Sequence, residues 1–286
     1  MRSRAIRITA QYGLISNSLI KHFFAVALLL PFLLSACAAA PSRRTEEADR
    51  IALQNGFQKE LVSSDPFVLT TYHRLGEKGA PVHVYLEGDG YAWVTPTRIS
   101  GNPTPRTPMV LSIAIEDPAA NVVYLARPCQ YTPAELNAEF DSLYWTNGRF
   151  SEPVVHSMDT SISHFARKAQ AGEVHLIGYS GGAAVAVLIA ARRGDVRSLR
   201  TIAGNLDPPA VNAYHDVSSL KGSLNPAEVA GAIKGIPMRH FIGTQDKVIP
   251  TFIAQSFADR TGDTLHRSVS EVNGADHSHG WRERWR

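Results

Sequence analysis

A glycine-rich turn between two apolar runs is the feature that most constrains this chain. The segment LIGYSGGAAVAVLIAA occupies residues 176–191. The short apolar run VHLI leads into the turn and is typical of a buried strand, whereas AAVAVLIAA after it is typical of a buried helix. Strands that are apolar on both faces and alternate with helices occur in parallel sheets covered on both sides. The turn therefore predicts an α/β fold.

The rest of the chain repeats this alternation. Strand-like runs occur at 66–75, 82–88, 121–126, 173–179, 199–204 and 239–244, and helix-like segments at 152–169 and 182–193. Together they predict a mostly parallel central sheet with helices on both faces. Residues 206–237 are less regular and are a candidate small lid. Residues 128–150, which carry Tyr131, Tyr144 and Trp145, are a candidate pocket wall, with simple packing as the alternative.

The N-terminal segment is typical of an export signal. Lys21 and His22 precede an apolar run at 23–34, which is shorter than the roughly 20 residues that a spanning helix needs. Four of the 29 basic residues lie in this segment, so the remaining 25 nearly balance the 26 acidic residues. This balanced composition argues against nucleic acid as a partner.

Residues 34–37, LSAC, resemble the lipobox of bacterial lipoproteins. The resemblance implies a signal peptide at 1–36 and a lipid on Cys37, which would anchor the protein in the bacterial cell envelope. An ordinary cleavable signal is the alternative. Ala38 and Ala39 resemble residues that permit transfer to the outer membrane, so we expect the periplasmic side of that membrane. We expect residues 37–50 to be a polar tether and 51–286 to be the folded domain.

A lipid on Cys37 leaves Cys129 without an intrachain disulfide partner. A lone cysteine after an apolar strand is most often a small buried hydrophobic residue, and a second nucleophile is the alternative. We expect the domain to fold without a disulfide.

Ser180 is the candidate nucleophile of the glycine-rich turn. A serine hydroxyl attacks a carbonyl only when a base can reach it and backbone N–H groups face the developing oxyanion. Gly178, Tyr179, Gly181 and Gly182 surround Ser180 in a G-x-S-x-G turn, and the glycines leave room for a strained backbone and for strand–helix packing. The segment thus predicts a nucleophile elbow, with a structural turn as the alternative.

Such a serine needs a base and an acid that orients the base, and candidates for both follow later in the chain. Asp246 comes after the strand-like run at 239–244, and His277 follows another strand-like run near the C-terminus. Asp207, after the preceding strand, is an alternative acid. His279 lies two residues after His277, a spacing compatible with zinc. Because no second cluster of ligands accompanies it, we expect no metal.

At these motifs, GYSGG, GTQDKVIP and GADH, the chain resembles the α/β-hydrolases over roughly residues 67–286. The resemblance implies that Ser180 attacks, His277 transfers the proton and Asp246 orients the imidazole. It also implies an oxyanion hole made by the backbone N–H groups of Gly181 and Asp89.

The loop that carries Asp89 departs from the pattern of many relatives, because its sequence is EGDG. Two carboxylates beside an oxyanion hole oppose negative charge unless they turn away or are paired. Arg98, Arg127 and Arg149 are the candidate partners. For Glu87 we expect a structural role in holding the loop.

These features predict a serine hydrolase that cleaves an ester or related acyl bond of a small molecule, without a cofactor. A peptidase or thioesterase of the same fold is an alternative, and so is a non-catalytic envelope protein that uses the fold for binding. The C-terminal GWRERWR is expected to be a solvated end, with contact to anionic headgroups as the alternative.

Overall fold

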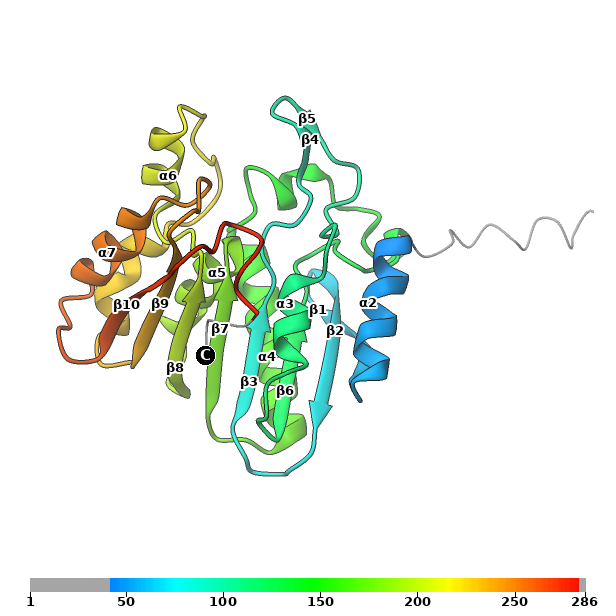
Figure 1. The fold of residues 1–286 in the computed structure, drawn as a ribbon. Helices are drawn as coiled ribbons and strands as arrows, with labels where there is room; N and C mark the ends of the chain where they lie inside the picture. Colours follow the sequence, from blue (N-terminus) through cyan, green and yellow to red (C-terminus); the bar gives the residue numbers. More distant parts are fainter. Residues whose placement is uncertain (1–41, 283–286) are drawn as a thin grey trace, which may run out of the picture. The chain divides into compact units, whose positions relative to one another are not determined.

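An eight-stranded sheet organises the part of the chain that the structure, a computed structural model, describes, residues 42–282 (Figure 1). Its strands lie in the order β1 (Gln58–Ser64), β2 (Phe67–Leu75), β6 (Asn121–Leu125), β3 (Val82–Leu86), β7 (Val174–Tyr179), β8 (Val196–Ile202), β9 (Met238–Gly243), β10 (Arg267–Val272). The neighbouring strands β6, β3, β7, β8, β9 and β10 are parallel to one another. Strand β2 is antiparallel to both its neighbours, β1 and β6. The prediction of a mostly parallel sheet is confirmed.

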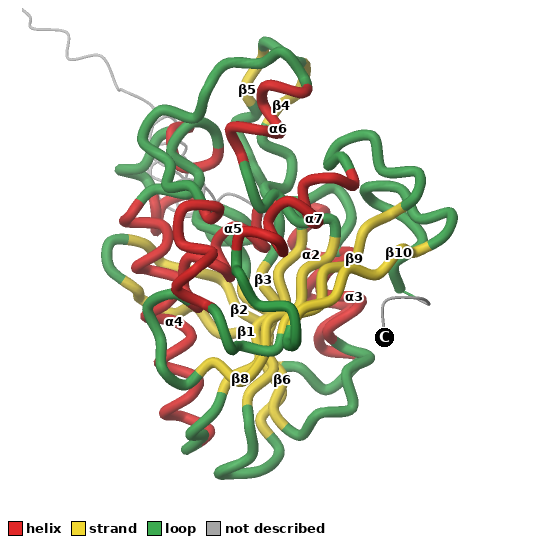
Figure 2. The backbone as a smooth tube through the Cα atoms, turned by 90° about the vertical axis from the view of Figure 1, so that its left-hand side faces the viewer, coloured by secondary structure: helices red, strands yellow, loops and turns green. Residues whose placement is uncertain are grey.

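Helices cover both faces of this sheet. One face carries α2 (Arg43–Gln54) and α3 (Met109–Ala114), and the other carries α4 (Glu152–Ala169), α5 (Gly181–Ala190), α7 (Thr251–Arg260) and the 3-10 helix η3 (Pro226–Ile233). In Figure 2 the helices α4 and α5 lie on one side of the strands and α3 on the other. Each face therefore has its own apolar core, as expected for an α/β fold.

The remaining elements stand at the carboxyl edge of the parallel strands. A small hairpin of β4 (Trp93–Thr95) and β5 (Arg98–Ile99) follows β3, the 3-10 helices η1 (Ala134–Asn137) and η2 (Ser142–Trp145) follow β6, and α6 (Pro208–Tyr214) follows β8. The segment at 128–150 and the first part of 206–237 thus stand at this edge, whereas residues 226–233 form η3 on one face of the sheet. Within residues 42–282 no helix has the length and apolarity needed to cross a membrane.

The start of the fold differs from the sequence-based expectation. Residues 43–50, assigned to the tether, form the first part of α2, so the tether prediction is wrong there. Ser42 caps the helix by accepting a hydrogen bond from the Thr45 N–H, and Ala48 and Ala52 are buried. The segment is small and charged on average, which is typical of a tether, but its buried residues share one face of the helix. The predicted signal peptide at 1–36, Cys37 and the rest of the tether up to residue 41 lie outside the described residues.

The order of the strands produces a topological switch point at the carboxyl edge. The chain runs from β3 to β6 on one side and then returns to β7 on the other side of β3. Loops that leave β3 and β7 therefore diverge, and in α/β sheets such a switch point is where ligands bind. Leu86 pairs with Gly178, so the loop after β3 and the turn after β7 begin side by side.

Candidate active site

Ser180 stands on a strained turn between β7 and α5. Its φ of 50° and ψ of −119° lie in a region that residues with a side chain rarely adopt. The backbone is held there by hydrogen bonds from the Ser180 N–H to the Ile202 carbonyl (2.9 Å) and from the Asn205 N–H to the Ser180 carbonyl (3.0 Å). The turn has the form of a nucleophile elbow, with the serine at the N-terminal end of a buried helix.

The glycines of this turn are required by close approach. A Cβ on Gly178 would lie 2.5 Å from the Ala183 Cα, and a Cβ on Gly182 would lie 2.4 Å from the carbonyl oxygens of Leu86 and Glu87. These are backbone atoms at the start of the helix and at the end of β3, so they have little freedom to move away. The glycines thus allow α5 to pack directly on the strand that bears the loop after β3.

The structure brings Ser180, His277 and Asp246 together from three separate segments. The Nε2 of His277 lies 3.1 Å from the Ser180 Oγ, and its Nδ1 lies 2.9 Å from the Asp246 Oδ2. The Asp246 side chain is only 1% exposed, and its other oxygen accepts hydrogen bonds from the N–H groups of Val248 (2.8 Å) and Ile249 (3.0 Å). The buried carboxylate is therefore fixed in position while it faces the imidazole.

Two residues that the sequence analysis did not assign to this role hold His277 by its backbone. Its carbonyl accepts a hydrogen bond from the Tyr179 hydroxyl at 2.8 Å and another from the Trp281 Nε1 at 3.2 Å. The Tyr179 ring also lies against the imidazole, with centroids 5.4 Å apart. Trp281 is 1% exposed, so the expectation of a solvated C-terminal end is wrong for this residue. A donor aimed at a backbone carbonyl leaves no pattern in a sequence.

The alternative site residues lie elsewhere or make other contacts. Asp207 caps α6 by accepting from the Ala210 N–H and lies 3.6 Å from Arg260. His279 is exposed and pairs with Asp276. Burial raises the pKa of the Cys129 thiol to about 11, so the thiol is protonated at neutral pH. Among residues 42–282, no cluster of three or more His, Cys, Asp or Glu side chains is placed to hold a metal ion.

Asp89 lies directly beside the turn of Ser180. A Cβ on Gly181 would lie 1.9 Å from the Asp89 Oδ1, so the carboxylate packs against the Gly181 backbone. Arg127 Nη1 lies 3.3 Å from one carboxylate oxygen and Arg149 Nε lies 3.0 Å from the other. Of the three candidate arginines, these two pair with the loop, whereas Arg98 is exposed on β5. The negative charge of Asp89 is therefore offset by two guanidinium groups.

Glu87 is buried beneath the same loop. Its carboxyl group accepts hydrogen bonds from the Gly88 N–H (2.8 Å) and from the Tyr124 hydroxyl (2.8 Å). Burial raises the pKa of Glu87 to about 7, although these hydrogen bonds and the nearby Arg127 act in the opposite direction. Below neutral pH, a largely protonated Glu87 places little negative charge behind the turn.

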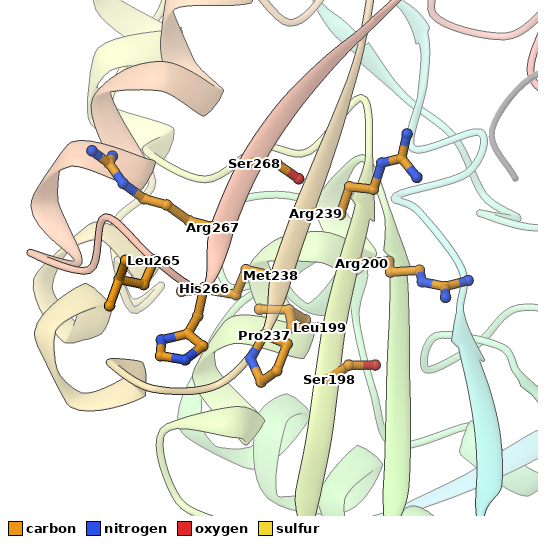
Figure 3. Close-up of a pocket in the computed structure, with 10 residues that line it drawn as sticks. All are labelled: Ser198, Leu199, Arg200, Pro237, Met238, Arg239, Leu265, His266, Arg267 and Ser268. Atoms are coloured by element: carbon orange, nitrogen blue, oxygen red, sulfur yellow. The ribbon is translucent and has the colours of Figure 1, made fainter.

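Open space adjoins His277 on one side. A hollow of about 450 Å³ is bordered by Gln245, Lys247, Val248 and residues 276–279. A second hollow, of about 420 Å³, lies over β8, β9 and β10 (Figure 3). Its wall includes Met238 and Arg267, which begin their strands, so it lies at the amino edge of the sheet, away from Ser180. Of these two hollows, the first borders the candidate site.

Solved structures resemble this fold. An acylaminoacyl peptidase of Pyrococcus horikoshii superposes with a TM-score of 0.59 at 14% identity, over 80% of this chain and 39% of that one. An esterase of Pyrococcus furiosus gives 0.58 at 12% identity, over 80% and 88%. Est1E from Butyrivibrio proteoclasticus gives 0.54 at 11% identity, over 77% and 90%. This chain thus spans about two fifths of the length of the peptidase.

No protein-family model and no curated protein sequence matches the chain. The structural similarities, together with the strand order and the elbow after β7, show that the chain has the α/β-hydrolase fold.

Proposed function

We propose that this protein is a serine hydrolase that cleaves an ester or related acyl bond of a small molecule through an acyl-enzyme. One observation carries the proposal: the imidazole of His277 lies within hydrogen-bonding distance of both the Ser180 hydroxyl and the buried Asp246 carboxylate. That geometry, on a strained turn at a helix N-terminus, is what a serine needs to become nucleophilic.

In the proposed reaction the Ser180 Oγ attacks the carbonyl carbon while His277 Nε2 accepts the hydroxyl proton. Asp246 holds the Nδ1–H tautomer and stabilises the imidazolium that forms. The N–H groups of Gly181 and Asp89 donate to the oxyanion. His277 then gives the proton to the leaving group, and the acyl-enzyme forms. Water, activated by His277, attacks the acyl-enzyme, releases the acid and restores the Ser180 hydroxyl. No cofactor takes part in these steps.

The position of Asp89 supports its part in this proposal. The two proposed donors belong to adjoining segments, because the Asp89 side chain packs on the Gly181 backbone. Arg127 and Arg149 hold the carboxylate, and both stand near the place where negative charge develops. The ion pairs thus position the loop and offset the charge that the sequence analysis found unfavourable.

The proposal is tested by hydrolysis of p-nitrophenyl acetate, butyrate and octanoate. The protein is a chain that begins at Ala38, because residues 42–282 enclose their own apolar core. Turnover that disappears in Ser180→Ala but remains in Ser278→Ala, a serine exposed beside His277, supports the proposal. A folded parent chain that hydrolyses neither these esters nor the corresponding thioesters and amides would favour the non-catalytic binding protein.

We further propose that Cys37 carries a lipid and holds the hydrolase at the periplasmic side of the outer membrane. The support is the LSAC motif after a short apolar run, with the first described helix beginning six residues after Cys37. Palmitate labelling of the full chain in a bacterial host, lost in Cys37→Ser, is the expected result. Equal labelling of both chains would contradict it.

A further inference from the structure

Six exposed apolar side chains gather in two groups at the carboxyl edge of the sheet. Single exposed apolar residues are normal on a protein surface, but grouped ones mark interaction sites. One group lies on the β4–β5 hairpin and the other around α6 and the start of α7, two segments that stand above the same edge (Figure 1). We call the six residues the rim patch: Trp93, Ile99, Tyr214, Val217, Val248 and Phe252.

The hairpin group is a cross-strand pair. Trp93 and Ile99 are register partners in the two-stranded sheet, so their side chains project from the same face. They are 38% and 40% exposed. The hairpin begins four residues after Asp89, and its base is tied down by a hydrogen bond from Trp145 Nε1 to the Ser100 carbonyl (3.0 Å). This group therefore adjoins the proposed oxyanion loop.

The second group lies next to His277. The rings of Tyr214 and Phe252 have centroids 6.1 Å apart and are 60% and 49% exposed. Val248 borders the hollow beside His277, and its N–H donates to Asp246. His215 Nε2 lies 2.7 Å from the Val248 carbonyl oxygen, which joins the end of α6 to this loop. One group thus adjoins the proposed oxyanion loop, and the other adjoins the loop that carries Asp246.

Leu136, Leu143 and Leu265 are also exposed but lack this arrangement. Leu265 is 85% exposed but precedes β10, at the opposite edge of the sheet. Leu136 and Leu143 stand at the carboxyl edge, but exposed carboxylates adjoin them: Glu135, Glu139 and Asp141. In the rim patch the neighbouring charges are mixed, because Arg98 precedes Ile99 and Lys247 precedes Val248, whereas Asp216 precedes Val217.

We propose that the rim patch docks on a lipid surface, so that the proposed active site opens toward acyl chains held in that surface. A lipid surface adapts to two separate protrusions, whereas a folded partner needs a matching shape for both. Trp and Tyr side chains favour the boundary between acyl chains and headgroups, and the cationic Arg98 and Lys247 suit anionic headgroups there. The negative charge of Asp216 partly cancels the attraction of Arg98 and Lys247 for anionic headgroups, so burial of apolar side chains supplies most of the binding free energy. Salt screens charges but not apolar burial, and we therefore expect binding to persist at high ionic strength.

Vesicle binding tests this surface independently of catalysis when the chain from Ala38 carries Ser180→Ala. The vesicles contain phosphatidylethanolamine and phosphatidylglycerol, and bound protein is measured by sedimentation. Trp93→Ser with Ile99→Ser, or Tyr214→Ser with Phe252→Ser, is expected to weaken binding about tenfold. Leu265→Ser is the matched control and is expected to bind as the parent does. Equal binding by all folded variants, or no binding by the parent, would overturn the proposal.

A second measurement, fluorescence quenching, uses a variant that keeps the apolar surface of the hairpin. Trp93→Phe keeps an apolar ring on the hairpin, so its binding to vesicles is expected to remain close to that of the parent. Lipids with brominated acyl chains quench a tryptophan that enters the surface. We expect them to quench the parent more strongly than Trp93→Phe. Equal fractional quenching in the two proteins would place Trp93 outside the lipid and overturn the proposal.

Discussion

The Nδ1 of His277 lies 2.9 Å from the Oδ2 of Asp246, whose other oxygen is already occupied by two backbone N–H groups. In Asp246→Asn the Oδ1 acceptor can remain in place, which turns the amide NH2 toward His277. The imidazole then carries its proton on the nitrogen that faces Ser180 and is a poor base. We expect kcat to fall by about 10⁴-fold with little change in the melting temperature.

Asp207 offers the matched control for this change, because it follows the neighbouring strand but caps α6. Asp207→Asn keeps the capping oxygen and is expected to lower kcat by no more than a few fold. Steady-state kinetics of both variants on one ester decide the matter. A larger loss in Asp207→Asn than in Asp246→Asn would show that the acid has been assigned to the wrong strand.

The ion pair between Arg149 and Asp89 predicts a specific kinetic defect. Removing the guanidinium in Arg149→Gln leaves Asp89 less firmly held and its charge less completely offset beside the developing oxyanion. We expect kcat for a soluble ester to fall about tenfold, with a smaller effect on KM, since the interaction matters most in the transition state. Arg98→Gln, on the exposed strand β5, serves as the control. If both variants keep full kcat, the Arg149–Asp89 ion pair does not support the oxyanion hole.

Glu87 makes folding stability depend on pH. Its pKa rises from an ordinary value of 4.5 to about 7 because it is buried. Between these values the folded chain binds more protons than the unfolded chain, so the free energy of unfolding falls as pH rises. The free energy of unfolding is highest below pH 4.5 and decreases as the pH rises through 7. The total decrease is about 3 kcal/mol.

Glu87→Gln isolates this contribution, because an amide does not titrate. Denaturant unfolding of both proteins at several pH values is expected to show a shallower decline for the variant between about pH 5 and 7. The variant should gain on the parent toward alkaline pH. Identical slopes in the two proteins would mean that the Glu87 carboxyl is not protonated in the folded chain.

Close packing at the start of α5 leaves no room for a methyl group on Gly182. The Cβ of Gly182→Ala would lie 2.4 Å from two backbone carbonyl oxygens at the end of β3, so the helix must move away from the strand. We expect a loss of about 2–3 kcal/mol in the free energy of unfolding, measured by denaturant titration. Gly101→Ala meets no atom within 4 Å and is expected to unfold as the parent does. Similar stability of both variants would contradict this account of the turn.

Local sequence patterns predict most elements of this fold, whereas they predict a tether for most of the segment that forms α2. Buried parallel strands such as β6 and β7 are apolar throughout, and α4 has a long amphipathic pattern with exact bounds at Glu152 and Ala169. The helix α2 is mostly charged and attaches through two alanines and through Asp49, which accepts a hydrogen bond from the Tyr72 hydroxyl (2.6 Å). Its small and charged composition is typical of a tether, although its buried residues lie on one face of the helix.

The sequence also predicts the main residues of the candidate site. Ser180, Asp246 and His277 follow strands whose carboxyl ends meet at one edge, and the sequence predicts all three as candidates. Asp207 satisfies the same rule, so the choice between the two acids depends on which side chain is used as a helix cap. The hydrogen bonds of Tyr179 and Trp281 to the His277 carbonyl depend on three-dimensional positions alone.

The most direct test of the proposed nucleophile is to locate the adduct of a fluorophosphonate, which reacts with activated serines. The chain from Ala38 is labelled and digested, and the modified peptide is sequenced by mass spectrometry. We expect one adduct, on Ser180, that is absent from Ser180→Ala and formed at least about a hundredfold more slowly in His277→Asn, since the base is then missing. A folded chain that stays unlabelled, or carries its adduct on another residue, would contradict the assignment of Ser180 as the nucleophile.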